Sequence, residues 1–135
     1  MSSKNVIITG TSRGIGLELV RILAAQGHQV LALSRNSDPV QQLNLDEVTT
    51  MPFDLSETSA YDKVSSHISE HWKSVDILIN NAGALIHKPF NETTMEDMQS
   101  IYSTNVFGLA ELTRTVLPFM GKDGHVVNIL SLIHI

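Results

Sequence analysis

The sequence predicts an α/β fold in which helices cover both faces of a doubly wound parallel sheet. Short apolar runs alternate along the 135 residues with stretches whose apolar residues recur at helical spacing, and strands that alternate with helices form βαβ units. The runs are continuous rather than alternating, which favours strands that are buried on both faces. We therefore expect a sheet of this kind, with ligands at the carboxyl ends of its strands.

The expected strands and helices follow one another in a regular order. The strands are expected at the apolar runs 6–9, 30–33, 48–53, 75–79 and 125–130, of which the third is the weakest. The helices are expected at residues 14–26, 56–72 and 94–120. Gly27 is a natural C-cap for the first helix, and Ser56 is an expected N-cap for the second.

The composition is that of a globular protein. Hydrophobic residues make up 42% of the chain and charged residues 17%, which excludes the disordered class. There is no cysteine, so disulfides and thiolate metal sites are excluded. The formal net charge of −5 argues against general nucleic-acid binding. No apolar run reaches the roughly 18 residues of a membrane span, and no signal-peptide pattern begins the chain, so we expect a cytoplasmic location.

The most informative stretch is TGTSRGIG, residues 9–16, which follows an expected strand and opens an expected helix. Gly10 can make the tight turn, Gly14 can let the backbone approach a phosphate, and Gly16 can allow close packing of helix on strand. The stretch is not a P-loop, because the lysine and the Ser/Thr of that motif are missing. A tight turn without a ligand remains an alternative for this pattern.

Four motifs, in the right order along the chain, resemble those of the short-chain dehydrogenase/reductase family. The glycine turn is similar to the family's cofactor turn, and Asp54-Leu55, after the third run, matches its adenine-side position. NNAG, residues 80–83, follows the fourth run and is similar to the family's second signature. NVFG, residues 105–108, matches the helix that carries a catalytic asparagine. The resemblance implies a Rossmann-type NAD(P)-binding domain over residues 1–129.

The resemblance implies cofactor contacts at three places in the chain. Asp54 would lie beside the adenine, and the loop after the fourth run would face the ribose and the nicotinamide. Asn80 is expected to brace the sheet rather than to touch the ligand. A loop carboxylate without a ligand is the alternative for Asp54. The implied cofactor-binding residues, apart from those at the end of the second run, are Gly10, Ser12, Arg13, Gly14, Ile15, Gly16, Asp54, Leu55, Asn81, Ala82 and Gly83.

The end of the second run distinguishes the two nicotinamide cofactors. NAD-binding relatives place an acidic residue where Ser34 stands, to bond the ribose 2′-hydroxyl. Ser34 is neutral, Arg35 follows it, and Arg13 lies inside the glycine turn. Two guanidinium groups near the ribose could clamp a 2′-phosphate, so we expect NADP(H) to be preferred over NAD(H). The alternative for Arg35 is a solvated loop position.

Asn105 lies on the apolar stripe of the third helical stretch. One interpretation is a core asparagine bonded to nearby backbone, since a buried amide without partners costs about 1–3 kcal/mol. The other, which the family implies, is a catalytic residue that holds a water linking a lysine to solvent. The family also implies that this helix builds a homodimer or homotetramer interface. The stripe consists of Met98, Ile101, Leu109, Leu112 and Val116.

The family's chemistry requires a tyrosine and a lysine at Tyr-x-x-x-Lys spacing. Tyr61 has Ser65 at that spacing, and Tyr102 has Val106. Ser131 stands where the family has its catalytic serine. We therefore expect an inactive N-terminal fragment of roughly half an enzyme, truncated after the fifth strand. The complete enzyme is expected to transfer hydride between the nicotinamide and a small carbonyl/alcohol substrate.

The last residues, LSLIHI at positions 130–135, match one reading frame of a transposon adapter used in sequencing libraries. The hypothesis is that this tail is not native, in which case Ser131 matches the catalytic position by coincidence.

Other classes of function remain open from the sequence. A non-catalytic NAD(P)-binding regulator or scaffold would also lack the tyrosine and lysine. A nucleotide-sugar epimerase or a methyltransferase is disfavoured by NNAG and by Asn105. HISEH, residues 67–71, matches the H-x-x-E-H pattern of some zinc peptidases. His67 and His71, however, lie about 100° from the inward stripe of their helix, so we expect a solvated helix edge and no metal.

Overall fold

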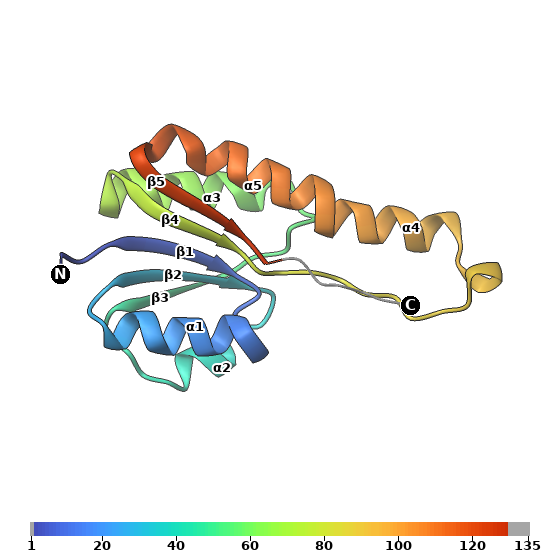
Figure 1. The fold of residues 1–135 in the computed structure, drawn as a ribbon, viewed down its shortest axis with the longest axis horizontal. Coiled ribbons are helices and arrows are strands. Elements are labelled where there is room, and N and C mark those ends of the chain that lie inside the picture. The colour runs from blue at the N-terminus through green and yellow to red at the C-terminus, as the bar shows by residue number, and fades with distance from the viewer. Residues whose placement is uncertain (1, 130–135) are drawn as a thin grey trace.

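The computed structural model describes residues 2–129, which form a five-stranded parallel sheet with helices on both faces. The strands lie in the order β3-β2-β1-β4-β5, so the predicted doubly wound α/β fold is confirmed (Figure 1). The elements are β1 (Asn5–Thr9), α1 (Gly14–Ala25), β2 (Gln29–Ser34), α2 (Asp38–Gln41), β3 (Val48–Pro52), α3 (Ala60–His67), the π-helical η1 (Ile68–Trp72), β4 (Val75–Asn80), the 3₁₀ turn η2 (Phe90–Glu92), α4 (Met95–Tyr102), the π-helical η3 (Ser103–Gly108), α5 (Leu109–Val116), the 3₁₀ turn η4 (Leu117–Phe119) and β5 (Met120–Asn128).

Two hydrophobic layers hold the helices against the sheet. Helices α1 and α2 lie on one face, and α3 and α5 lie on the other (Figure 1). Successive side chains of a strand point to opposite faces, so Val6 and Ile8 join the layer under α1 whereas Ile7 joins the layer under α3 and α5. All three are fully buried. This is the physical reason why the run is apolar at every position rather than at every second one.

The topology places a crevice beside the end of β1. From β1 the chain first builds the sheet outward through β2 and β3, and then returns to add β4 on the other side. The connections that leave β1 and β4 therefore diverge at the carboxyl ends of two neighbouring strands. Ligands of open α/β sheets bind at such a switch point, and the loops that follow β1, β2, β3 and β4 all meet there.

The second expected helix begins later than predicted. The structure starts α3 at Ala60 rather than at Ser56, and the prediction of Ser56 as its N-cap is wrong. The Ser56 hydroxyl instead donates to Oδ1 of Asp54 at 2.7 Å, and the Ser56 N–H donates to the same oxygen at 2.9 Å. Asp54 thus forms a local turn that competes with the helix for Ser56. Gly27, by contrast, follows α1 with φ +88°, as a C-terminal glycine should.

The third helical stretch is continuous over residues 95–119, as predicted, but its hydrogen-bond pattern changes along its length. Thr94 caps α4 with a reciprocal pair of bonds to Asp97. The π-helical turn η3 then carries Asn105, and α5 follows it. Of the predicted inward stripe, Leu112 and Val116 of α5 are fully buried. Met98 is not, because α4 projects beyond the sheet and has no strand beneath it (Figure 1).

The fifth strand is more exposed than its sequence suggests. Val126 and Val127 keep 39% and 43% of their surface exposed, although an apolar run of this kind indicates a strand covered on both faces. Within the described residues β5 is an edge strand that pairs with β4 alone.

The sequence does not predict the short helix α2, since four residues are too few for a periodic pattern.

Candidate functional site

The glycine turn brings two stretches of backbone into direct contact. Gly10 and Gly14 have φ values of +68° and +60°, which side-chain-bearing residues rarely adopt. A Cβ on Gly10 would lie 2.8 Å from Cα of Ala82. A Cβ on Gly16 would lie 2.1 Å from the Gly10 carbonyl oxygen. The turn after β1 therefore packs on the loop after β4 and on the start of α1 with no room for a methyl group at either position.

Hydrogen bonds hold this turn and the loop after β4 in register. The buried hydroxyl oxygen of Thr9 accepts the N–H groups of Asn81 and Ala82, each at 2.9 Å. The Asn81 amide donates back to the Gly10 carbonyl at 3.2 Å. Arg13 stands at the N-cap of α1, and no side chain caps that end of the helix. The first backbone N–H groups of α1 are therefore free to bind an anion, and the positive end of the helix dipole favours that binding.

A cleft of about 1070 Å³ opens at this switch point. Four loops supply its walls, from β1, β2, β3 and β4, and helices α4 and η3 close one side. Of the predicted cofactor residues Gly16 alone does not line it, because Gly16 lies beneath the turn. The predicted residues that line the cleft are Gly10, Ser12, Arg13, Gly14, Ile15, Ser34, Arg35, Asp54, Leu55, Asn81, Ala82 and Gly83.

Several lining residues had not been predicted. Asn36, Phe53 and Ser56 follow β2 and β3 beside residues that were. A face of small hydroxyl residues lies on the helical side, and its spacing of three and four positions just before Asn105 was a signal in the sequence. These hydroxyl residues are Ser100, Ser103 and Thr104.

The charged groups of the cleft are two guanidinium groups and one carboxylate. Arg13 and Arg35 both line it, as does Asp54. The pKa of Asp54 is lowered, first by its hydrogen bonds from Ser56 and then, against some opposing effect of burial, by the positive charge of Arg35. The hydroxyl of Ser34 donates to the Asn36 carbonyl at 2.8 Å. The end of β2 thus presents a cation and a neutral, internally bonded serine, with no carboxylate to repel an anion.

Asn105 joins the long helical stretch to the loop after β4. Its Oδ1 accepts the Ala84 N–H at 2.7 Å, and its Nδ2 donates to the Ala84 carbonyl at 2.9 Å. Both polar atoms of the amide thus bond to backbone, as the first interpretation of this residue expects. The side chain fixes the position of Ala84, which lines the cleft. Its family role in holding a water stays a prediction.

Asn80 braces the sheet, as the sequence led us to expect. Its side-chain amide donates to Oγ1 of Thr113 on α5 at 3.1 Å and to Oδ1 of Asn128 on β5 at 2.9 Å. Asn80 is buried and does not line the cleft. Within the NNAG motif, the first asparagine therefore serves the scaffold and the next three residues face the cleft.

The prediction of a solvated edge for the histidine pair is wrong for His67. The Nε2 atom of His67 is buried and has no hydrogen-bond partner. The ring of Trp72 packs edge-on against the imidazole ring, with centroids 5.3 Å apart. Burial lowers the pKa of His67, with a smaller effect from the neighbouring His71. His71 is exposed. Between residues 2 and 129, no three His, Cys, Asp or Glu side chains are arranged to hold a metal ion.

Two further predictions concern parts outside this site. Ser131 and the tail at 130–135 lie outside the described residues. Across the part of the chain that is described, no helix has the length and apolarity needed to cross a bilayer.

Comparisons with known proteins match the whole of this architecture. The pattern of the family described as short chain dehydrogenase matches residues 4–134. A ketoacyl reductase of Nostoc sp. is 35% identical over 98% of this chain and 49% of its own length. An NADP-dependent 3-hydroxy acid dehydrogenase of Escherichia coli strain K12 is 34% identical over 93% of this chain and 53% of its own length. The chain thus spans about half the length of these curated relatives.

Solved structures are similar to the same extent. A short-chain dehydrogenase from Streptomyces avermitilis superposes with a TM-score of 0.87 at 30% identity, over 96% of this chain and 50% of that one. A short chain dehydrogenase/reductase from Saccharomyces cerevisiae superposes with a TM-score of 0.88 at 27% identity, over 96% of this chain and 54% of that one.

Proposed function

The chain belongs to the short chain dehydrogenase family. We propose that its cleft binds NADP(H) and that the protein functions as an oxidoreductase. The observation that carries this proposal is the junction of the glycine turn with the loop after β4. A side chain at Gly10 or Gly16 would clash with the backbone atoms of that junction. The uncapped start of α1 faces the same cleft. These features match the requirements of a dinucleotide pyrophosphate, which needs close backbone approach and N–H donors.

The proposed assignment gives each wall of the cleft one part of the cofactor. The glycine turn and α1 would hold the pyrophosphate. Asp54 and Leu55 would lie at the adenine, and Asn81 to Gly83 would face the ribose and the nicotinamide. Bound NADPH would supply hydride for the reduction of a small carbonyl compound to its alcohol, and NADP⁺ in the same cleft would accept hydride in the reverse reaction. The relatives named for a ketoacyl reductase and for a 3-hydroxy acid dehydrogenase support this reaction class.

The preference for NADPH over NADH rests on Arg13 and Arg35. Both line the cleft, and Ser34 offers no carboxylate for a ribose 2′-hydroxyl. Charge-assisted hydrogen bonds contribute about 1.5–3 kcal/mol each, so two of them to a 2′-phosphate correspond to at least about a hundredfold in Kd. The name of the E. coli relative, an NADP-dependent enzyme, is consistent with this preference.

The test compares two double variants, each of which removes two arginine charges, one pair inside the cleft and one pair outside it. Arg13→Ala with Arg35→Ala should raise the Kd of NADPH at least about a hundredfold and that of NADH less than about threefold. Arg21→Ala with Arg114→Ala is the matched control, because both arginines pair with glutamates on exposed helix surfaces. The control should change neither Kd. Equal losses for the two cofactors in the first variant would refute the assignment, and a wild-type chain that binds neither would refute the function.

Binding is expected without turnover in this 135-residue chain, because it contains no Tyr-x-x-x-Lys. In a longer form that carries that motif, Asn105→Leu should abolish ketone reduction and leave NADPH binding close to wild type. The proposed roles of Asn105 and Ser131 would be excluded if their substitution left such turnover intact. NADPH-dependent ketone reduction by the present chain would contradict the proposal that the acid/base is supplied by that motif.

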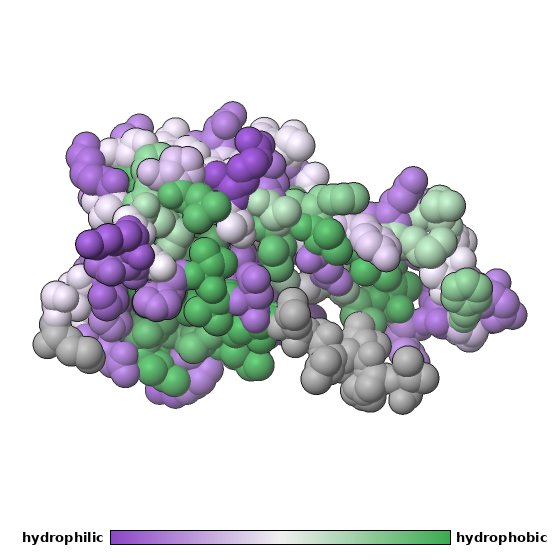
Figure 2. Space-filling model, turned by 45° about the horizontal axis from the view of Figure 1, so that its top comes forward, coloured by the Kyte–Doolittle hydropathy of each residue, from purple (hydrophilic) through white to green (hydrophobic). Residues whose placement is uncertain are grey.

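The proposed partner is a second copy of the protein. On the face in Figure 2, hydrophobic residues gather in the middle of the molecule and continue along the part on the right, where α4 and the segment that precedes it lie. Met95, Val106 and Phe107 expose 67%, 46% and 66% of their surface along α4 and η3. Phe107→Asp should abolish a homodimer or homotetramer in sedimentation, whereas Ile22→Asp on α1 should not. Unchanged mass for Phe107→Asp would exclude this helix as the interface.

A further inference from the structure

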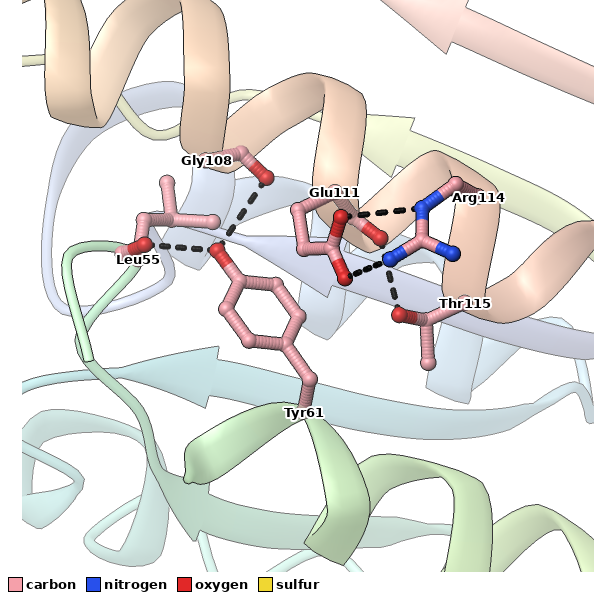
Figure 3. A network of polar contacts seen from close by, with 6 residues as sticks. All are labelled: Leu55, Tyr61, Gly108, Glu111, Arg114 and Thr115. Carbon is pink, nitrogen blue, oxygen red and sulfur yellow. Dashed lines mark hydrogen bonds and ion pairs between the residues drawn. The ribbon is translucent and has the colours of Figure 1, made fainter. Parts of the chain in front are cut away.

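Tyr61 is a buried tyrosine that the proposed function does not use. Its ring lies in the core between α3 and α5 and is only 5% exposed. Its hydroxyl donates to the Leu55 carbonyl at 2.5 Å and lies 3.3 Å from the Gly108 carbonyl. Figure 3 shows the phenol oxygen between these two carbonyl groups. One hydroxyl proton therefore serves two acceptors from segments that are far apart in the sequence.

The first acceptor belongs to a wall of the cleft. Phe53, Asp54, Leu55 and Ser56 all line the cleft after β3, whereas Tyr61 does not. Tyr61 contacts this wall from behind, since its ring also packs edge-on against Phe53 with centroids 5.2 Å apart. The wall has no strand or helix of its own between β3 and α3. The Phe53 N–H donates to the Ser34 carbonyl at 2.8 Å and so ties the start of the wall to β2. Beyond Phe53, the conformation of the wall depends on the local turn at Asp54 and on the bond from Tyr61 to the Leu55 carbonyl.

The second acceptor belongs to the helix that closes the cleft. A Cβ on Gly108 would lie 2.7 Å from Cβ of Leu55 and 3.0 Å from its carbonyl oxygen. The helix backbone and the wall are therefore in direct contact beside the phenol. One turn earlier, Asn105 in η3 holds both backbone groups of Ala84. The contacts form a continuous path from the wall after β3, through Gly108 and η3, to the loop after β4.

The hydroxyl remains a donor over the whole physiological pH range. Burial raises the pKa of Tyr61 to about 12, with smaller effects from the negative charges of Glu111 and Asp54. Glu111 is itself paired with Arg114 on the surface of α5. A buried carbonyl that loses its donor costs more than an average hydrogen bond contributes.

We propose that Tyr61 is a positioning residue for the adenine half of the bound nucleotide: its hydroxyl fixes the wall Phe53–Ser56 against the start of α5. The inference rests on the proposed binding of NADP(H) in this cleft. It goes beyond a packing role, because a tyrosine that only fills the core would be replaced by phenylalanine with no selective effect on one half of the ligand.

The test uses Tyr61→Phe, which keeps the ring and its packing on Phe53 and removes only the hydroxyl. The Kd values of NADPH and of 2′,5′-ADP should rise about tenfold, which corresponds to roughly 1.4 kcal/mol. The Kd of reduced nicotinamide mononucleotide should change less than about twofold. Tyr102→Phe is the matched control, because the Tyr102 side chain is 55% exposed and bonds to none of these groups. It should bind all three ligands as the wild type does.

A second control separates positioning from stability. Val64→Ala truncates a fully buried side chain one turn along α3 and should lower the free energy of unfolding without a selective effect on 2′,5′-ADP. Wild-type affinity of Tyr61→Phe for 2′,5′-ADP would overturn the proposal. An equal loss for the adenine and nicotinamide halves would overturn it too.

Hydrogen exchange tests the same inference without any ligand. In Tyr61→Phe the amides of residues 53–57 should exchange at least about tenfold faster than in Tyr102→Phe, because their opening would no longer break the bond at Leu55. Unchanged exchange there would overturn the positioning role. If the wild-type chain bound no nucleotide, the proposed function would fail, and this measurement would still decide whether Tyr61 fixes the wall.

Discussion

Gly16→Ala is the sharpest test of the glycine turn, because it adds one methyl group at the most crowded point of the site. The new Cβ would lie 2.1 Å from the Gly10 carbonyl oxygen and 2.6 Å from Nδ2 of Asn81. An ordinary contact between such atoms is about 3.4 Å or more. The start of α1 would therefore have to move by more than about 1 Å relative to the turn.

The loss of unfolding free energy in Gly16→Ala depends on whether the atoms around the new methyl group can move away. The obstacle at Gly10 is backbone, and the hydrogen bonds from Asn81 and Ala82 to Thr9 hold its surroundings. Overpacking costs typically about 1–3 kcal/mol, and we expect the upper end here because no flexible side chain can yield. Alanine stabilises a helix by up to about 1 kcal/mol relative to glycine, which offsets part of the overpacking cost. The net loss of unfolding free energy should be about 2 kcal/mol or more.

Urea denaturation followed by the fluorescence of Trp72, the only tryptophan, measures this loss. Gly121→Ala is the matched control, since a Cβ there meets no atom within 4 Å. The control should stay within about 0.5 kcal/mol of the wild type, while Gly16→Ala should also lose NADPH affinity. A Gly16→Ala chain as stable as the control would refute the close packing of α1 on the turn.

The remaining predictions concern the core and two titrating groups. Leu112→Ala, at a fully buried position of α5, should lower the free energy of unfolding by about 2–5 kcal/mol in urea; a loss below about 1 kcal/mol would contradict its burial. Because the pKa of His67 is lowered in the folded state, the unfolded chain binds a proton first, so stability should fall as the pH drops below about 6.5. His67→Gln should flatten this dependence and His71→Gln should not, and equal curves for the two variants would contradict the assignment. Ser56→Ala should raise the pKa of Asp54, whose lowering comes first from Ser56, as an NMR titration would show; an unchanged titration would exclude that cause.

Local sequence rules were sufficient to predict the structure where the residues of one short stretch determine its conformation. The apolar runs at β1 and β2 are strands because every side chain has a covered face to enter. Gly27 ends α1 because a positive φ is needed there. The glycine turn is identifiable for the same reason, and the residues predicted from it do line the cleft, except Gly16 beneath the turn.

Local rules failed where a specific side-chain contact overrode the periodic pattern, from a close neighbour at Ser56 and His67 and from another loop at Asn105. Ser56 looked like the start of a helix, but Asp54 captures its hydroxyl and α3 begins at Ala60. His67 looked solvated, but Trp72 packs over it. The helical pattern across Asn105 does not indicate a π-helical turn. In that turn, both polar atoms of the Asn105 side chain form hydrogen bonds with the backbone of Ala84.

The sequence by itself determined the parallel α/β fold, the family and the segments that build the cleft, because periodicity and glycine positions act over a few neighbouring residues. The tertiary structure alone decided how these segments are held together. Thr9 meets Asn81 across 72 positions, and Tyr61 meets Gly108 across 47. No local pattern encodes such pairings, since each depends on where the sheet places the ends of strands that are remote in the chain.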